Sequence, residues 1–230
     1  SKTLHLKFPA MVDGVSQIED TISTEQLKRL EVVDNFTFAS QYQQEPQILG
    51  GNLIKTEWFK LYKDEISFDY KIISADTAQK TKEHNDYSVF TCWGVSGKNI
   101  YLCDMIRGKF EAHILERVAI EFLRKHSPRE MLIEDKSSGT GLIQVLINKG
   151  FPITPISVQK DKLTRVMDSI PYIAAGNVFV KSDENWVAGF FSETAGFRSD
   201  MGHEHDDQVD SMTQVVKHFY MSSTSILYAL

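Results

Sequence analysis

The stretch FDYKIISAD, residues 68–76, reads as an apolar β-strand that ends in an aspartate. Two more strand-like runs follow it, DYSVFTCWGVS (86–96) and NIYLCDMIRG (99–108), and the turn-forming residues GKN separate them. Three sequential strands with tight connections predict an antiparallel meander. This meander is the starting point from which the rest of the fold can be inferred.

Helices and strands alternate in the part of the chain that follows the meander. The elements that we expect are a helix over 111–126, a strand over 130–135, a helix over 139–150, a strand over 151–158, a helix over 162–176, a short strand over 177–180 and an amphipathic segment over 184–197. Right-handed crossovers would place the later strands parallel to the first one. The sequence therefore predicts the α/β class, as a ribonuclease H-like mixed β-sheet flanked by helices on both faces.

The first part of the chain has a different pattern. A helix start signal at Ser23 or Thr24 precedes a helical pattern, and Pro46 and the glycines of LGG (49–51) then break the chain. We interpret residues 1–60 as a helical lead-in and linker and residues 61–230 as the main domain.

The composition is that of an ordinary globular protein. The 230 residues are 42% hydrophobic and 24% charged, and no run is long and apolar enough for a membrane span or a signal peptide. Cys92 and Cys103 are expected on neighbouring strands as reduced, cytoplasmic thiols. The net charge of −6 argues weakly against a general nucleic-acid coat but allows a local basic strip.

Acidic residues stand where the predicted parallel strands end. Asp76 ends the first strand, and Glu134 and Asp135 end the fourth. If these strands are neighbours, their ends lie within about 5 Å of each other. Successive strand residues face opposite ways, so one of Glu134 and Asp135 should point into a site, and we favour Asp135.

A third group of acids lies in GHEHDDQVDSM (202–212), ahead of a helix whose apolar residues recur at spacings of three and four. Asp206 and Asp207 could approach the same edge of the sheet, with Asp210 one turn later. A single aspartate there could cap the helix, whereas several like charges favour a cation. His203 and His205 could bind a metal or a phosphate, or could simply be exposed.

Carboxylates without cysteine ligands favour hard ions such as Mg²⁺ or Mn²⁺. Two such ions about 3.5 to 4 Å apart can promote phosphodiester cleavage. Lys160, Lys162 and Arg165 follow the fifth strand, and they fit either a DNA-phosphate contact or a solvated helix start.

Several motifs together resemble one family, the nuclease half of terminase large subunits from tailed bacteriophages and prophages. The motifs that carry the resemblance are SADTAQKTKEHNDYSVFTCWGV (74–95), LIEDKSSGTGLIQVL (132–146), KDKLTRV (160–166), AAGNVFV (174–180) and HDDQVDSM (205–212). The upstream TFASQYQQEP (37–46) is similar to the stretch that closes the preceding ATPase half. The chain has no Gly-x-x-x-x-Gly-Lys-Ser/Thr phosphate loop, which favours an excised fragment without ATPase activity.

The resemblance implies a metal-dependent endonuclease that cuts concatemeric double-stranded viral DNA in the cytoplasm of the bacterial host. It implies Asp76 as a ligand shared by two divalent ions, completed by Asp135 or Glu134 and by Asp207 with Asp206, and leaves Asp210 possible. The terminase small subunit and the capsid portal protein are the implied partners, and no membrane is. A Holliday-junction resolvase and a non-catalytic docking module remain the alternatives.

Overall fold

The computed structural model describes residues 7–33, 38, 42–44, 53–78, 87–136, 138–157, 160–199, 202 and 205–227. The chain divides into two compact units, Ser1–Gly50 and Gly51–Leu230. This division falls ten residues before the boundary that we placed at residue 60. No helix in the described part of the chain is long and apolar enough to cross a membrane.

The first unit contains a hairpin and a helix. Strands β1 (Met11–Val12) and β2 (Val15–Ser16) pair antiparallel across Asp13 and Gly14, whose φ angles of 51° and 74° suit a two-residue turn. Helix α1 (Thr24–Val33) begins after Ser23, whose hydroxyl accepts the main-chain N–H of Gln26 while the Gln26 side chain accepts the N–H of Ser23. This reciprocal cap explains why the predicted helix starts here.

The second unit is built on a seven-stranded mixed sheet with the order β3-β9-β6-β5-β4-β7-β8. Its strands are β3 (Lys60–Tyr62), β4 (Tyr70–Asp76), β5 (Ser88–Ser96), β6 (Asn99–Gly108), β7 (Glu130–Glu134), β8 (Ile153–Ile156) and β9 (Val178–Lys181). β4, β5 and β6 form the predicted antiparallel meander, and β7 lies parallel to β4. The ribonuclease H-like layout expected from the sequence is confirmed.

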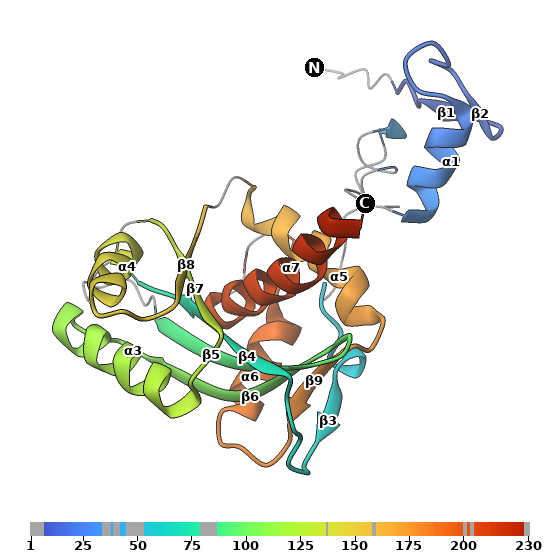
Figure 1. The fold of residues 1–230 in the computed structure, drawn as a ribbon. Helices are drawn as coiled ribbons and strands as arrows, with labels where there is room; N and C mark the ends of the chain where they lie inside the picture. The colour runs from blue at the N-terminus through green and yellow to red at the C-terminus, as the bar shows by residue number, and fades with distance from the viewer. Residues whose placement is uncertain are drawn as a thin grey trace. The chain divides into compact units, whose positions relative to one another are not determined.

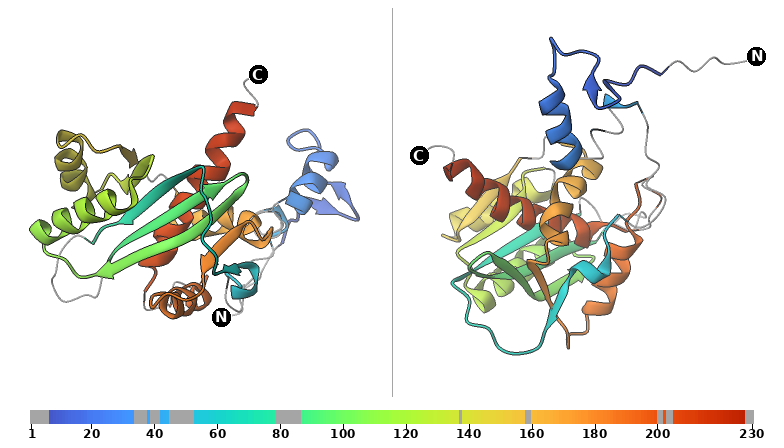
Figure 2. Two further views of the ribbon diagram at one scale, coloured as in Figure 1. Left: turned by 60° about the horizontal axis from the view of Figure 1, so that its bottom comes forward. Right: turned by 90° about the vertical axis from the view of Figure 1, so that its right-hand side faces the viewer.

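Helices cover both faces of this sheet, as Figures 1 and 2 show. The helices of the second unit are η2 (Thr56–Trp58), α3 (Ala112–His126), α4 (Ser138–Asn148), α5 (Lys162–Ala174), α6 (Val187–Gly196) and α7 (Asp207–Leu227). α3 and α4 pack on one face, where Ile73, Phe90 and Ile133 belong to the buried core. α7 crosses the other face over β4 and β5, and α5 and α6 pack against it.

Strand parity decides which residues meet α7. Ile73 and Ala75 belong to the core under α3 and α4, whereas the alternate residue Ser74 faces α7 through its neighbour Thr91. Cys92 and Cys103 are free thiols on adjacent strands with their sulfur atoms 3.7 Å apart, next to an irregularity in the β5–β6 pairing.

Candidate active site

Five carboxylates line one pocket of about 300 Å³ at the carboxyl ends of β4 and β7, beneath the first turns of α7. They are Asp76, Glu134, Asp206, Asp207 and Asp210. These residues come from three elements that are far apart in the sequence. The sheet order brings the first two together, because β4 and β7 are parallel neighbours whose ends meet at the same edge.

Asp76 experiences the charges of acids from both other elements. Burial raises the pKa of Asp76 well above its usual range, and Asp210, Asp207 and Glu134 raise it further, while Lys162 opposes them. A carboxyl in this setting resists ionisation unless a cation compensates the neighbouring negative charge. Asp76 is therefore the point at which the repulsion within the pocket concentrates.

Glu134, rather than Asp135, lies at the pocket. Ile72 pairs with Glu130 in the parallel β4–β7 ladder, so two and four residues further along Asp76 and Glu134 have the same parity and the same face. Asp135 instead accepts a hydrogen bond of 2.7 Å from the Thr140 hydroxyl at the start of α4. Our preference for Asp135 thus differs from the placement in the structure, although the ligand role of either residue is a separate question.

The turn that follows β7 leaves no room for a side chain at Gly139. A Cβ atom there would collide with the main-chain carbonyl oxygen of Glu134. Glycine therefore allows α4 to begin directly against the end of β7, and this close packing fixes the main chain that carries Glu134.

A buried glutamate from α6 caps the N-terminus of α7. The Glu193 carboxylate accepts the main-chain N–H groups of Gln208 and Val209 at 2.6 and 3.3 Å, and the Gln208 side-chain amide at 2.6 Å. The first turn of a helix has free N–H groups and the positive end of the helix dipole, so a carboxylate is favourable there. Glu193 therefore fixes the position from which the α7 acids project.

Arg107, at the end of β6, connects this cap to the pocket. Its guanidinium lies 3.2 Å from a Glu193 oxygen and 3.6 Å from an Asp207 oxygen, and it stacks 4.0 Å above the Tyr87 ring centre. Burial, Glu193 and Asp206 raise the pKa of Asp207 to about 6, although Arg107 and a main-chain hydrogen bond from Tyr87 oppose the shift. Arg107 thus reduces a repulsion that it does not remove.

Lys162, near the start of α5, occupies the space between two of the α7 acids. Its ammonium nitrogen lies 2.6 Å from an Asp206 oxygen and 2.7 Å from an Asp210 oxygen. Burial lowers the pKa of Lys162, but the two carboxylates outweigh burial and the pKa is raised. Arg165 adds a contact of 3.2 Å to Asp210, a buried carboxylate whose pKa is nevertheless raised, chiefly by burial.

Buried hydroxyl groups hold the next turn of α7 against the sheet. The Ser211 and Thr91 hydroxyl oxygens are 2.7 Å apart, and the Trp93 indole N–H donates to Thr91 at 2.8 Å. The Ser211 hydroxyl also donates to the Ser74 carbonyl. Ser74 lies two residues before Asp76 in β4, so this network sets the rotation of α7 relative to the strand that bears Asp76.

The chemistry of the pocket fits hard divalent cations. Its lining contains five carboxylates against the three basic groups of Lys136, Lys162 and Arg165, and carboxylate oxygen is the donor that Mg²⁺ and Mn²⁺ prefer. Among the described residues, no three histidine, cysteine or acidic side chains yet stand close enough together to hold an ion. The Lys162 ammonium accounts for part of this spacing, because it holds Asp206 and Asp210 around itself.

The remaining predicted residues lie in different places. Lys160 forms an ion pair of 2.7 Å with Asp168 and is not part of the pocket lining, whereas Lys162 and Arg165 are. The His205 ring packs edge-on against Tyr87 at 5.3 Å, and His203 lies outside the described residues.

Sequence reasoning missed four residues of this region: Tyr87, Arg107, Lys136 and Glu193. The only signal for Glu193 was a lone acid within the apolar segment WVAGFFSETAGF (186–197). Nothing in the local sequence distinguishes Arg107 or Lys136 from other basic residues at strand ends.

A mixed sheet of this order with carboxylates at the β4 and β7 ends defines a ribonuclease H-like domain. The family model described as "Terminase RNaseH-like domain" matches residues 73–219, and the chain belongs to this family. The match runs from β4 to α7 and therefore includes every carboxylate of the pocket. No curated protein matches the chain in sequence at a significant level.

Solved structures share the fold. The full-length large terminase of a thermophilic bacteriophage is 13% identical, with a TM-score of 0.61 over 86% of this chain and 53% of that one. The large terminase nuclease of the thermophilic phage G20c with bound zinc is 18% identical, with a TM-score of 0.53 over 69% of this chain and 92% of that one. The same nuclease with bound magnesium matches equally well, with a TM-score of 0.53, 18% identity and coverage of 70% and 93%. The chain thus spans about half the length of the first of these proteins.

Proposed function

We propose that this chain is a metal-dependent DNA endonuclease that cleaves concatemeric double-stranded viral DNA during genome packaging. The observation that carries the proposal is the convergence of Asp76, Glu134 and the α7 acids in one pocket of a terminase RNaseH-like domain. Support for divalent ions also comes from G20c nuclease structures with bound zinc, cobalt and magnesium.

In this proposal the pocket binds two divalent cations, Mg²⁺ or Mn²⁺. Asp76 is the shared ligand because it lies within the electrostatic reach of Glu134, Asp207 and Asp210, and Glu134 replaces Asp135 as the β7 ligand. Such cations, when bound, supply Lewis acidity and neutralise charge in phosphodiester hydrolysis. Asp206 completes the set.

The basic residues of the lining have a different role in the proposal. Lys162 must leave Asp206 and Asp210 when cations bind, and its ammonium is then available to contact a DNA phosphate together with Arg165. The exposed Lys136 lies beside Glu134 at the pocket and offers a third contact. Lys160 is left out of this set because its ammonium pairs with Asp168.

The wider context of the activity belongs to the longer protein of which this chain resembles a part. We propose double-stranded DNA as the substrate, the terminase small subunit and the capsid portal protein as partners, and the cytoplasm of the bacterial host as the location. These assignments rest on the family and on the match to about half of a full-length phage large terminase.

The test is cleavage of supercoiled plasmid by the purified chain with Mg²⁺, Mn²⁺, Ca²⁺ or EDTA. The test variant is Asp76→Asn, and the matched control is Asp183→Asn, which removes a carboxylate that is 67% exposed and pairs with Lys63. We expect cleavage with Mn²⁺ or Mg²⁺, loss of cleavage in EDTA and in Asp76→Asn, and full cleavage by the control. Mn²⁺ binding by calorimetry, without DNA, should also be lost in Asp76→Asn.

Two outcomes would replace this function. A folded chain that binds Mn²⁺ but cuts no plasmid would favour the non-catalytic docking module. Cleavage of a four-way junction in strong preference to linear duplex would favour the Holliday-junction resolvase.

A further inference from the structure

A second pocket lies on the other side of Arg165 from the acids. It has a volume of about 220 Å³ between the end of β8, α5 and the third and fourth turns of α7. Its walls include Pro155, Ile156, Arg165, Gln214, Lys217 and His218. No acidic residue lines it, in contrast to the neighbouring pocket, and Arg165 belongs to both.

Two buried donors at this pocket have no hydrogen-bond acceptor. The Arg165 Nε and Gln214 Nε2 atoms are both buried, and neither has a partner among the described residues. A buried donor without an acceptor is costly, and native proteins satisfy most such groups. Unsatisfied donors that line a cavity therefore indicate an absent acceptor.

The positive charge of the pocket is only partly compensated. Arg165 is paired with Asp210 and His218 lies 3.1 Å from Glu130, but no described carboxylate lies within 4 Å of the Lys217 ammonium. A cavity with amide, guanidinium and ammonium donors and no acid suits an oxyanion. Its small volume suits a single phosphate group.

We propose that this pocket binds an internucleotide phosphate of the same DNA strand whose neighbouring phosphodiester enters the acidic pocket. The proposal rests on the nuclease function proposed above. Gln214 follows Asp210 by four residues, which is about 6 Å along a helix, and each DNA strand presents a phosphate about every 3.4 Å along its axis. A strand that meets the α7 acids can therefore place a phosphate one or two nucleotides away at Gln214 and Lys217.

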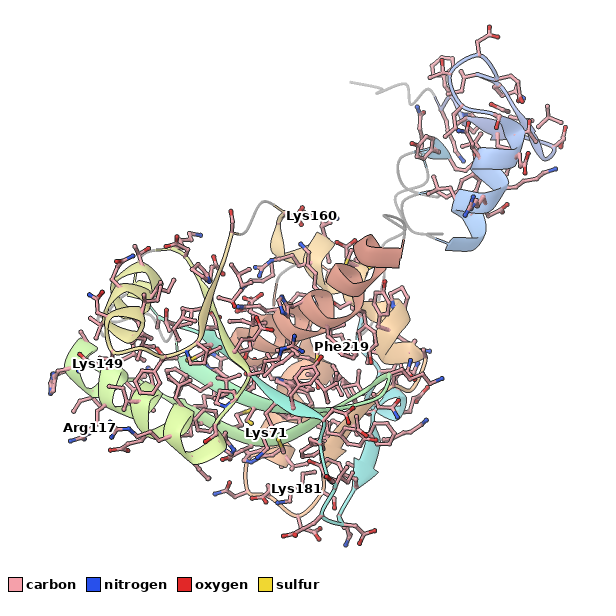
Figure 3. All side chains as sticks on the ribbon, viewed as in Figure 1. Lys71, Arg117, Lys149, Lys160, Lys181 and Phe219 are labelled. Carbon is pink, nitrogen blue, oxygen red and sulfur yellow. The ribbon has the colours of Figure 1, made fainter. Side chains whose placement is uncertain are left out.

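The test compares the DNA affinity of three variants of the full chain in EDTA, where no cleavage occurs. The variants are Gln214→Met, Lys217→Met and the control Lys149→Met. Lys149 lies just past α4, pairs with Glu116 at 3.6 Å and is far from Lys160 and α5 in Figure 3. Fluorescence anisotropy with a short labelled duplex, repeated over a range of salt concentrations, gives the affinity and its salt dependence.

The two pocket variants should differ in a way that a structural role would not produce. Lys217→Met should weaken binding and reduce the slope of log K against log salt by about one, because one phosphate contact is lost. Gln214→Met should weaken binding about threefold to tenfold without changing the slope, because it removes one neutral donor. Its melting temperature should not fall, because Gln214 Nε2 has no partner to lose. Lys149→Met should bind like the wild type.

Three results would overturn the assignment. The first is wild-type affinity in both pocket variants, and the second is an equal loss in Lys149→Met, which would indicate only general charge. The third is stabilisation by inorganic phosphate that is lost in Lys217→Met while DNA affinity is unchanged, which would assign the pocket to a free anion. Plasmid cleavage by the wild type in Mn²⁺ separates these results from failure of the nuclease function itself.

Discussion

Replacing Asp207 with asparagine should stabilise the protein in EDTA at neutral pH. The folded state raises the pKa of Asp207 from 3.8 to about 6. A carboxyl with a raised pKa keeps its proton more tightly when folded, so the free energy of unfolding falls as the pH rises from about 4 to about 6. Above that window the full penalty applies, and Asp207→Asn, which has no charge to bury, should avoid it.

The size of the effect follows from the shift. Each pKa unit corresponds to about 1.4 kcal/mol, so a shift of about two units corresponds to about 3 kcal/mol at pH 7.5 and almost nothing at pH 4. For a domain of this size that is an increase of about 6 to 12 °C in melting temperature. The lost contact of 3.6 Å to Arg107 should subtract little, because Glu193 still pairs with Arg107.

Tryptophan fluorescence is a suitable assay, because Trp58, Trp93 and Trp186 all lie in the unit Gly51–Leu230 and report its unfolding alone. Thermal melts in EDTA from pH 4 to pH 8 should show the variant gaining on the wild type as the pH rises. Asp183→Asn, an exposed control, should follow the wild type throughout. A variant that is less stable than the wild type at pH 8, or a difference that does not change with pH, would refute the reasoning.

Two other substitutions test the charge balance around α7. Lys162→Met should lower the dissociation constant for Mn²⁺ about tenfold by calorimetry without DNA, because a bound cation no longer displaces an ammonium from Asp206 and Asp210; unchanged or weaker Mn²⁺ binding would contradict this. Glu193→Ala should reduce the free energy of unfolding by about 2 to 3 kcal/mol, because it removes the cap on Gln208 and leaves buried donors without acceptors. In urea denaturation Glu193→Gln should recover part of that loss, and equal stability of Glu193→Ala and the wild type would argue against the cap.

The sequence was sufficient for the fold because each strand carries its own signal. The meander, the parallel β7 and the helices on both faces all follow from apolar patterns and turn residues that the structure reproduces. The choice between Glu134 and Asp135 was available in principle, since the parity of Asp76 and the parallel register together select Glu134. It was missed because alternation was applied to β7 without its neighbour.

The contacts that arrange the site could not be read from the sequence. Glu193 reaches the α7 N-terminus across 15 residues of chain, and Arg107 reaches both Glu193 and Asp207 from a different strand. Such contacts depend on how α6, α7 and β6 pack, and no periodicity or spacing encodes that packing. The position of Lys162 between two acids is equally a product of α5 lying against α7.

The N-terminus of α7 explains how the chain tolerates so many acids in one place. Glu193, Asp207 and Asp210 all lie at the end of a helix where the dipole and free N–H groups favour negative charge. Arg107 and Lys162 add positive charge on either side, yet the pKa values of Asp207 and Asp210 remain raised. The helix end and its cations therefore compensate only part of the repulsion. A divalent cation would relieve the rest, so metal binding and folding stability should be coupled, and the Asp207→Asn variant should gain stability in EDTA as it loses affinity for Mn²⁺.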